Sequence, residues 1–169
     1  YVLKAQVLAG GRGKGVFSSG LKGGVQLSRS LKDMEVYAKQ MLGHRLTTHQ
    51  TGPEGVVVQR LMLAEAKDLA QEGYFAIILD RSSGGPMLVA SPCGGMDIEA
   101  VAADRPQMIF REPVADITKG PTEQQLVKIA QQMHLAGTPE ILRSTVNQLA
   151  KLYRLFCALD ATMVEINPL

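Results

Sequence analysis

The stretch LKAQVLAGGRGKG, residues 3–15, is the most informative part of the amino-acid sequence. It begins like a β-strand and then passes into four glycines among six residues, with Arg12 and Lys14 between them. Glycines let backbone N–H groups approach an anion closely, and the two cations would offset its charge. The stretch therefore predicts a strand that leads into a phosphate-binding loop.

Two common phosphate-binding loops do not fit this stretch. A Walker A loop needs Ser or Thr after its Gly-Lys pair, but Gly15 follows Lys14, and its first glycine would fall on Leu8. The dinucleotide fingerprint needs a glycine at position 16 or 18, where Val16 and Ser18 stand. The remaining interpretation is a flexible, glycine-rich flap over a polyphosphate, although a plain surface turn would also explain the glycines taken alone.

Basic residues gather at the beginning of the chain. The net charge is only +2, which argues against a polycation that binds nucleic acid through its whole surface. Residues 1–32, however, contain six basic side chains, and Asp33 is the first acidic residue. Lys4 stands among the apolar residues of the first predicted strand, where burying an ammonium group is costly without an anion. We expect an anion-binding end, with a solvated basic face as the alternative.

Length and composition limit the class of protein. The chain has 169 residues, of which 46% are hydrophobic, enough for one globular domain with two lobes. Cys93 and Cys157 have no motif spacing, so we expect reduced thiols in an intracellular protein. No apolar run is long enough to span a bilayer, and no targeting segment is recognised. The chain opens at Tyr1 within a strand and stops at Leu169 after a proline, so we expect a piece of a longer protein.

Hydrophobic periodicity predicts a mixed α/β chain of the α+β type. The turn SSGG, residues 82–85, should connect two apolar strands as a hairpin, which argues against a purely parallel Rossmann sheet. Thr122 is a candidate N-cap for the helix that follows it, and Gly43 is a candidate C-cap for the first helix. The expected strands are 1–9, 23–28, 56–66, 74–81, 86–91 and 161–169, and the expected helices are 30–43, 97–109, 123–133 and 140–160.

The closing segment VEINPL, residues 164–169, carries two polar residues among apolar ones. Glu165 and Asn167 are two apart on a predicted strand, so their side chains share one face. Carboxylate and carboxamide oxygens suit Mg²⁺, which often bridges phosphates. An Asx turn before Pro168 would explain the pair equally well. Together with the phosphate loop, the pair predicts a Mg²⁺ site.

Five segments, in the same order, resemble the β subunit of succinyl-CoA synthetase (succinate–CoA ligase). They are VLKAQVLAGGRGKGVFSSGLKGGVQL, MLGHRLTTHQTG, AIILDRSSGGPMLVAS with the GG that follows, DIEAVA and DATMVEINPL. The resemblance covers essentially all 169 residues. The long loop GKGVFSSGLKGGV is similar to the eukaryotic, mitochondrial-type subunit. It implies the mitochondrial matrix or a related organelle, or the cytoplasm if the source is bacterial.

This resemblance implies part of an ATP-grasp fold, in which two α/β lobes with mixed or antiparallel sheets and flanking helices clamp a nucleotide. The lobes would be residues 1–63 and 64–169, with the CoA-ligase domain and a second Mg²⁺ ligand beyond the chain. The implied reaction, in the tricarboxylic acid cycle, is succinate + CoA + NTP ⇌ succinyl-CoA + NDP + phosphate. A phosphohistidine on a partner α subunit would carry the phosphoryl group, and succinate and CoA would bind mainly outside this segment. The chain alone would then be inactive.

The same resemblance assigns roles to individual residues. Those implied to bind the nucleotide are Lys4, Gly11, Arg12, Gly13, Ala64, Ala66, Lys67 and Glu72. Lys4 and the glycine loop would contact the phosphates, the segment 64–67 the base, and Glu72 the ribose hydroxyls. Asn167 would be a Mg²⁺ ligand, and Glu165 would be the catalytic acid near the phosphates.

The choice of nucleotide and of acid is not settled by the resemblance. The amino-acid sequences of residues 16–27 and 63–72 are more similar to those of GTP-type subunits than to those of ATP-type subunits. Lys67, by contrast, stands at a gate position where ATP-type subunits carry a lysine, and this favours ATP. A malate–CoA ligase β subunit would look almost the same. A non-catalytic anion- or RNA-binding module is the other alternative, but only eight aromatic residues occur, which argues against a nucleic-acid partner.

Overall fold

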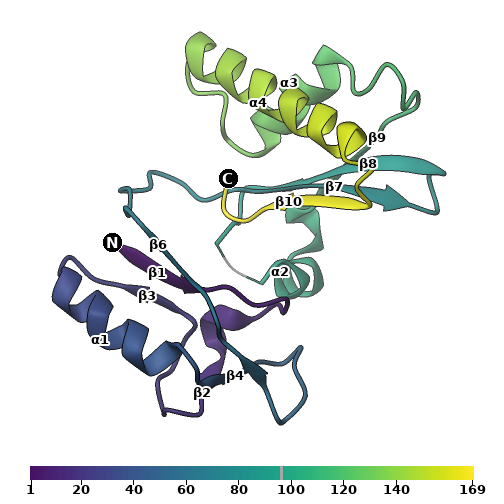
Figure 1. The fold of residues 1–169 in the computed structure, drawn as a ribbon. Coiled ribbons are helices and arrows are strands. Elements are labelled where there is room, and N and C mark those ends of the chain that lie inside the picture. Colours follow the sequence, from purple (N-terminus) through teal and green to yellow (C-terminus); the bar gives the residue numbers. More distant parts are fainter. Residues whose placement is uncertain (96) are drawn as a thin grey trace. The chain divides into compact units, whose positions relative to one another are not determined.

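The computed structural model describes residues 1–95 and 97–169 (Figure 1). Two compact units divide the chain, Tyr1–Asp68 and Leu69–Leu169. Both are mixtures of helices and antiparallel sheets, as the sequence predicts. Cys93 and Cys157 are free thiols, also as expected. In the part of the chain described, no helix is both long and apolar enough to cross a lipid bilayer.

The first unit is built on a three-stranded antiparallel sheet with β1 in the centre. The strand order is β3-β1-β6, and the bounds are Val2–Ala5 for β1, Val25–Leu27 for β3 and Leu61–Ala64 for β6. Leu3 and Ala5 alternate with more exposed residues along β1 and are buried together with Met34 and Met41 of helix α1. This helix, Leu31–Met41, ends where Gly43 takes a φ of 75°, so the predicted C-terminal glycine is confirmed.

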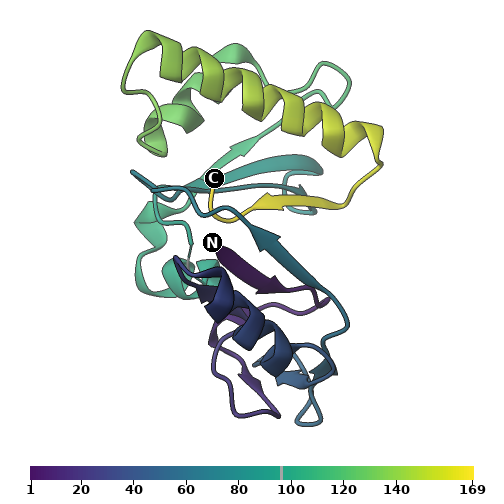
Figure 2. The same ribbon diagram turned by 60° about the vertical axis from the view of Figure 1, so that its left-hand side comes forward.

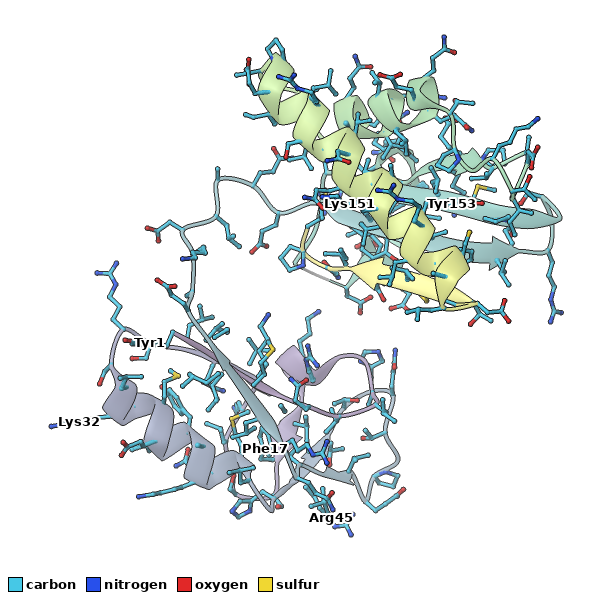
Figure 3. The ribbon with its side chains drawn as sticks, turned by 45° about the horizontal axis from the view of Figure 1, so that its top comes forward. Tyr1, Phe17, Lys32, Arg45, Lys151 and Tyr153 are labelled. Carbon is cyan, nitrogen blue, oxygen red and sulfur yellow. The ribbon has the colours of Figure 1, made fainter. Side chains whose placement is uncertain are left out.

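A second, smaller sheet completes the first unit. Its order is β2-β4-β5, with bounds Val16–Phe17, Arg45–Thr47 and Val56–Val57, and a 3₁₀ turn, η1, precedes it at Arg12–Lys14. Phe17 pairs with Leu46 across the strands, and both side chains are buried. Phe17 lies in the interior of this unit and Arg45 at its edge (Figure 3).

The second unit contains a four-stranded antiparallel sheet of order β10-β7-β8-β9. The bounds are Tyr74–Asp80 for β7, Gly85–Ser91 for β8, Phe110–Pro113 for β9 and Met163–Ile166 for β10. Helices α3, Glu123–Gln132, and α4, Pro139–Ala158, cover one face of the sheet. Helix α2, Ile98–Asp104, lies on the opposite side and is followed by the 3₁₀ turn η2, Pro106–Met108 (Figures 1 and 2).

The core of the second unit lies between the sheet and helices α3 and α4. Its largest buried side chains include Phe75, Ile77, Leu88, Ile129, Leu149 and Phe156. The predicted cap of α3 is confirmed as a capping box between Thr122 and Gln125. Because Phe75 and Ile77 of β7 point into this core, Tyr74 and Ala76 face the other side of the sheet, where they are also buried.

Candidate functional site

Lys4 lies in the middle of the central strand of the first unit. It is opposite Val25 on β3 and Met62 on β6, and its side chain is half-buried on the face turned away from helix α1. Among the described residues, no carboxylate forms an ion pair with Lys4. A half-buried ammonium with this surrounding is suited to an anion supplied by a ligand.

The glycine loop is anchored to β1 at one residue. The Arg12 guanidinium donates to the Ala5 carbonyl oxygen at 3.2 Å, and the Arg12 carbonyl oxygen accepts from the Gly24 N–H at 2.7 Å. Gly11 has a φ of 72°, which glycine adopts without strain. Gly13 is exposed, and a Cβ placed there would meet nothing within 4 Å. The tip of the loop is therefore open to a ligand while its base is held.

A neighbouring loop packs against the start of this flap. Gly10 donates its backbone N–H to the Gln50 side-chain oxygen at 2.7 Å, and a Cβ on Gly11 would overlap the His49 ring. Sequence reasoning missed both partners, because no local pattern connects residues 49–50 to the glycine loop. At Gly11 the positive φ and the His49 contact favour glycine independently of any ligand.

The predicted base-reading segment begins at the end of β6. Ala64 is the last residue of that strand and pairs with Val2, whereas Ala66 and Lys67 follow it as irregular backbone. The Lys67 ammonium lies 3.0 Å from the Glu65 carboxylate, and both side chains are about three-quarters exposed. An exposed ion pair of this kind holds its partners weakly, so Lys67 can reorient toward a ligand.

Three strand ends of the second unit meet at one end of the sheet. Because β10, β7 and β8 are antiparallel neighbours, the start of β7 lies beside the ends of the other two strands. Glu72 precedes β7 and Asn167 follows β10. Gly73 and Leu169 exchange two backbone hydrogen bonds, at 2.8 and 3.1 Å, which tie these segments together. The fold thus brings Glu72 and Asn167 to the same end of the second unit.

Glu165 is exposed on the face of the sheet opposite helices α3 and α4. It lies across from Ala76 on β7, so the side chain of Tyr74, two residues earlier, shares that face diagonally. Tyr74 is only 4% exposed and lies close enough to the Glu165 carboxylate to sense its charge. Burial first, and then the negative charge of Glu165, raise the pKa of Tyr74 to about 12. Sequence reasoning missed Tyr74, a neutral phenol on the same face of the sheet as the predicted catalytic acid.

This environment predicts how Tyr74 titrates. The phenol pKa is raised on folding, so its stabilising contribution is complete below about pH 10 and is lost as the pH rises toward 12. The free energy of unfolding should therefore fall more steeply between pH 10 and 12 in the unsubstituted protein than in Tyr74→Phe. Denaturant unfolding at several pH values measures this difference. Equal slopes for the two proteins would show that the phenol ionises normally.

The polar residues of β10 have the donor chemistry that Mg²⁺ requires. Asn167 Oδ1 accepts the Gly95 N–H at 2.6 Å, and a carboxamide oxygen has a second lone pair for a cation. Glu165 supplies a carboxylate two residues earlier, within β10. One or two such oxygens, completed by phosphates and water, are a usual protein contribution to a Mg²⁺ site.

The predicted site residues fall into two groups. Lys4, Ala64 and residues 11–13 belong to the first unit, and Glu72, Glu165 and Asn167 to the second. Each group is assembled within its own unit from segments far apart in the sequence. That both groups bind one nucleotide stays a prediction.

A cavity of about 270 Å³ lies elsewhere on the second unit. Its lining comes from α4 and the loop before α3: Lys119, Pro121, Asn147, Ala150, Tyr153 and Arg154. None of these is a predicted site residue, and Tyr153 uses its hydroxyl to donate to the Ile117 carbonyl oxygen at 3.0 Å. The cavity lies over the helical layer, on the other side of the sheet from Glu165.

The fold and these residues define a known class of protein. The family model of the ATP-grasp domain matches residues 1–169, and the chain belongs to this family. ATP citrate lyase from Methanothrix soehngenii, solved in complex with citrate and coenzyme A, has a similar fold, with a TM-score of 0.64. That similarity covers 99% of this chain and 34% of the lyase chain at 19% sequence identity.

Curated relatives narrow the class. The chain is 52% identical over 167 residues to the mitochondrial succinate–CoA ligase [GDP-forming] subunit beta of Bos taurus and 51% identical to that of Homo sapiens. It is 51% identical over 168 residues to the mitochondrial [ADP-forming] subunit beta of Dictyostelium discoideum. Each match covers 99% of this chain but only 37–38% of the relative. The chain therefore spans less than two-fifths of the length of these relatives.

Proposed function

We propose that this chain is the nucleotide-binding part of a succinate–CoA ligase β subunit. The observation that carries the proposal is the identity of about 50% over 99% of the chain to β subunits of both nucleotide types. The proposed reaction is succinate + CoA + NTP ⇌ succinyl-CoA + NDP + phosphate. A phosphohistidine on a partner α subunit carries the phosphoryl group, and the enzyme operates in the tricarboxylic acid cycle of a mitochondrion or related organelle.

The residues of this chain would act mainly by charge and position. Phosphoryl transfer asks for little covalent chemistry from the protein, so stabilising the charge on the phosphates lowers most of the barrier. Lys4 and the loop at Gly11–Gly13 would hold the phosphates, and Glu72 would accept hydrogen bonds from the ribose. Bound Mg²⁺, held by Asn167, would neutralise phosphate charge. Glu165, which shares a face of the sheet with Tyr74, would receive the incoming histidine of the α subunit.

The proposal is tested with the full-length β subunit assembled with its α subunit. We expect succinyl-CoA formation that depends on NTP, Mg²⁺ and succinate, with phosphorylation of an α-subunit histidine when CoA is omitted. Activity with malate in place of succinate would favour the malate–CoA ligase alternative. A complex that forms neither thioester, but is stabilised by polyanions in a salt-sensitive manner, would point instead to an anion- or RNA-binding module.

The charge of Lys67 is the basis for proposing which nucleotide the enzyme prefers. We propose that its ammonium, exposed in the base-reading segment, favours ATP over GTP through the electrostatics of base entry. Lys67→Leu should then lower kcat/KM for ATP relative to GTP by about 10-fold, a difference of roughly 1.4 kcal/mol. Parallel kcat/KM measurements with the two nucleotides test this. A strong GTP preference that Lys67→Leu leaves unchanged would rule the assignment out, and Lys22→Leu, on an exposed lysine of another segment, is the control.

A further inference from the structure

A turn of two glycines, Gly94 and Gly95, contacts both the predicted ribose-binding residue and the predicted metal ligand. The Gly94 N–H donates to the Glu72 carbonyl oxygen at 2.7 Å. The next N–H, from Gly95, donates to Asn167 Oδ1 at 2.6 Å. The turn follows β8, and it therefore lies at the end of the sheet where β7 begins and β10 ends.

An added side chain would overlap backbone at Gly94 and would displace the exposed Glu72 carboxylate at Gly95. A Cβ on Gly94 would overlap the Gly73 carbonyl oxygen. A Cβ on Gly95 would overlap the Glu72 carboxylate, and Gly95 also has a φ of 70°. Gly84, in the turn between β7 and β8, has nearly the same φ, 71°, but nothing within 4 Å of an added Cβ. Gly84 and Gly95 thus share a positive φ, and only Gly95 is in contact with Glu72.

This packing connects two predicted ligand-binding residues, Glu72 and Asn167, through one turn. A backbone donor that fixes the orientation of a ligating group sharpens metal affinity, because the ligand no longer samples other rotamers. The Gly95 N–H does this for Asn167, and the missing Cβ of the same residue leaves room for the Glu72 carboxylate. A displacement of this one turn would move the sugar-binding group and the metal-binding group together.

We propose that Gly95 is a positioning residue that holds Glu72 and Asn167 in register, so that the ribose and the metal-bound phosphates are recognised as one unit. The identities of the two ligands rest on the proposed function. The mechanical coupling between the turn and Glu72 rests on the structure of the second unit alone.

Binding of Mg²⁺ and ADP to the full-length subunit tests the proposal directly. Gly95→Ala should raise the half-saturating Mg²⁺ concentration at fixed ADP by about 10-fold or more, because outer contacts of this kind typically change metal affinity 10–100-fold. The affinity for ADP should fall as well. Gly84→Ala should leave both values within about 2-fold of the unsubstituted protein. Unchanged Mg²⁺ and ADP affinities in Gly95→Ala, measured by titration calorimetry, would overturn the proposal.

A double-mutant cycle keeps the proposal testable if Gly95→Ala folds poorly. Removing the carboxylate with Glu72→Ala should relieve the overlap, so that Gly95→Ala costs no more in Tm in that background than Gly84→Ala does. If Gly95→Ala lowers the Tm equally with and without Glu72, the contact does not exist and the inference fails. This readout is independent of enzymatic activity, so a failure of the proposed function and a failure of the coupling are distinguishable.

Discussion

Glu165→Gln is expected to lower kcat for phosphoryl transfer to the α subunit by about 10²–10³-fold, while the KM for the nucleotide changes less than about 3-fold. Glutamine has the same shape as glutamate and can still accept a hydrogen bond, so the substitution removes the charge and little else. The proposed role of Glu165 is to receive the histidine, and this role needs the carboxylate. Single-turnover phosphorylation of the α-subunit histidine by NTP measures the step without succinate or CoA.

A second measurement on the same variant checks the geometry behind this expectation. The charge of Glu165 contributes to the raised pKa of Tyr74, so Glu165→Gln should lower that pKa from about 12. Absorbance titration of the phenol in Glu165→Gln and in the unsubstituted subunit reports the shift. Glu35→Gln, an exposed glutamate in the middle of helix α1, is the matched control and should change neither kcat nor the titration. A normal kcat together with a lowered Tyr74 pKa would show that the Glu165 carboxylate has no role in the reaction.

The elements that the sequence predicts well are those with local signals. The capping box at Thr122 and the glycine after α1 depend on residues within a few positions of the helix ends, and both are confirmed. The β7–β8 hairpin is likewise predicted from the residues of its turn. Its second strand begins at Gly85, one residue earlier than expected. Short-range chemistry suffices for such elements.

The elements that depend on distant partners are predicted poorly. β2 and β4 are two and three residues long, and they depend on pairing between distant segments: Val16 and Phe17 pair with Thr47 and Leu46. β9 was likewise missed, although it pairs with β8 as an edge strand. The apolar run 56–66 looks like one strand, but the chain changes sheets within it. β5 pairs with β4, whereas β6 pairs with β1.

The expected first strand and second helix are shorter in the structure than periodicity suggests. The strand expected over 1–9 ends at Ala5, because the chain then turns into the loop that Arg12 ties to that strand. The helix expected over 97–109 ends at Asp104 and gives way to η2, which starts at Pro106. Proline disfavours helical geometry in the residue before it, so this boundary has a local cause.

The same contrast holds for the site. Spacing alone predicts that Glu165 and Asn167 share a face, and composition alone predicts the glycine loop. Tyr74 and the Gly94–Gly95 turn have no such signature, because their importance arises from the register between β7 and β10 and from the meeting of three strand ends. Residues that orient other residues are therefore seen only once the sheet is known.

Lys4→Met is expected to weaken nucleotide binding without lowering the stability of the ligand-free protein. The variant should raise the KM for the nucleotide about 10–100-fold, equivalent to the 1.5–3 kcal/mol of a hydrogen bond to a charged group. The Tm without ligand should stay the same or rise, because Lys4 is half-buried on β1 and, among the described residues, forms no ion pair. Replacing such an ammonium by a thioether of similar length removes a desolvation cost.

The control for Lys4 is a lysine whose charge is solvated. Lys32→Met on α1 is suitable because Lys32 is exposed and points away from the first unit (Figure 3). It should leave both the KM and the Tm nearly unchanged. Thermal unfolding with and without Mg–ADP, together with steady-state kinetics of the heterodimer, measures both quantities. If Lys4→Met lowers the ligand-free Tm and leaves nucleotide affinity intact, Lys4 is a structural residue of the sheet, and the phosphates must be held elsewhere.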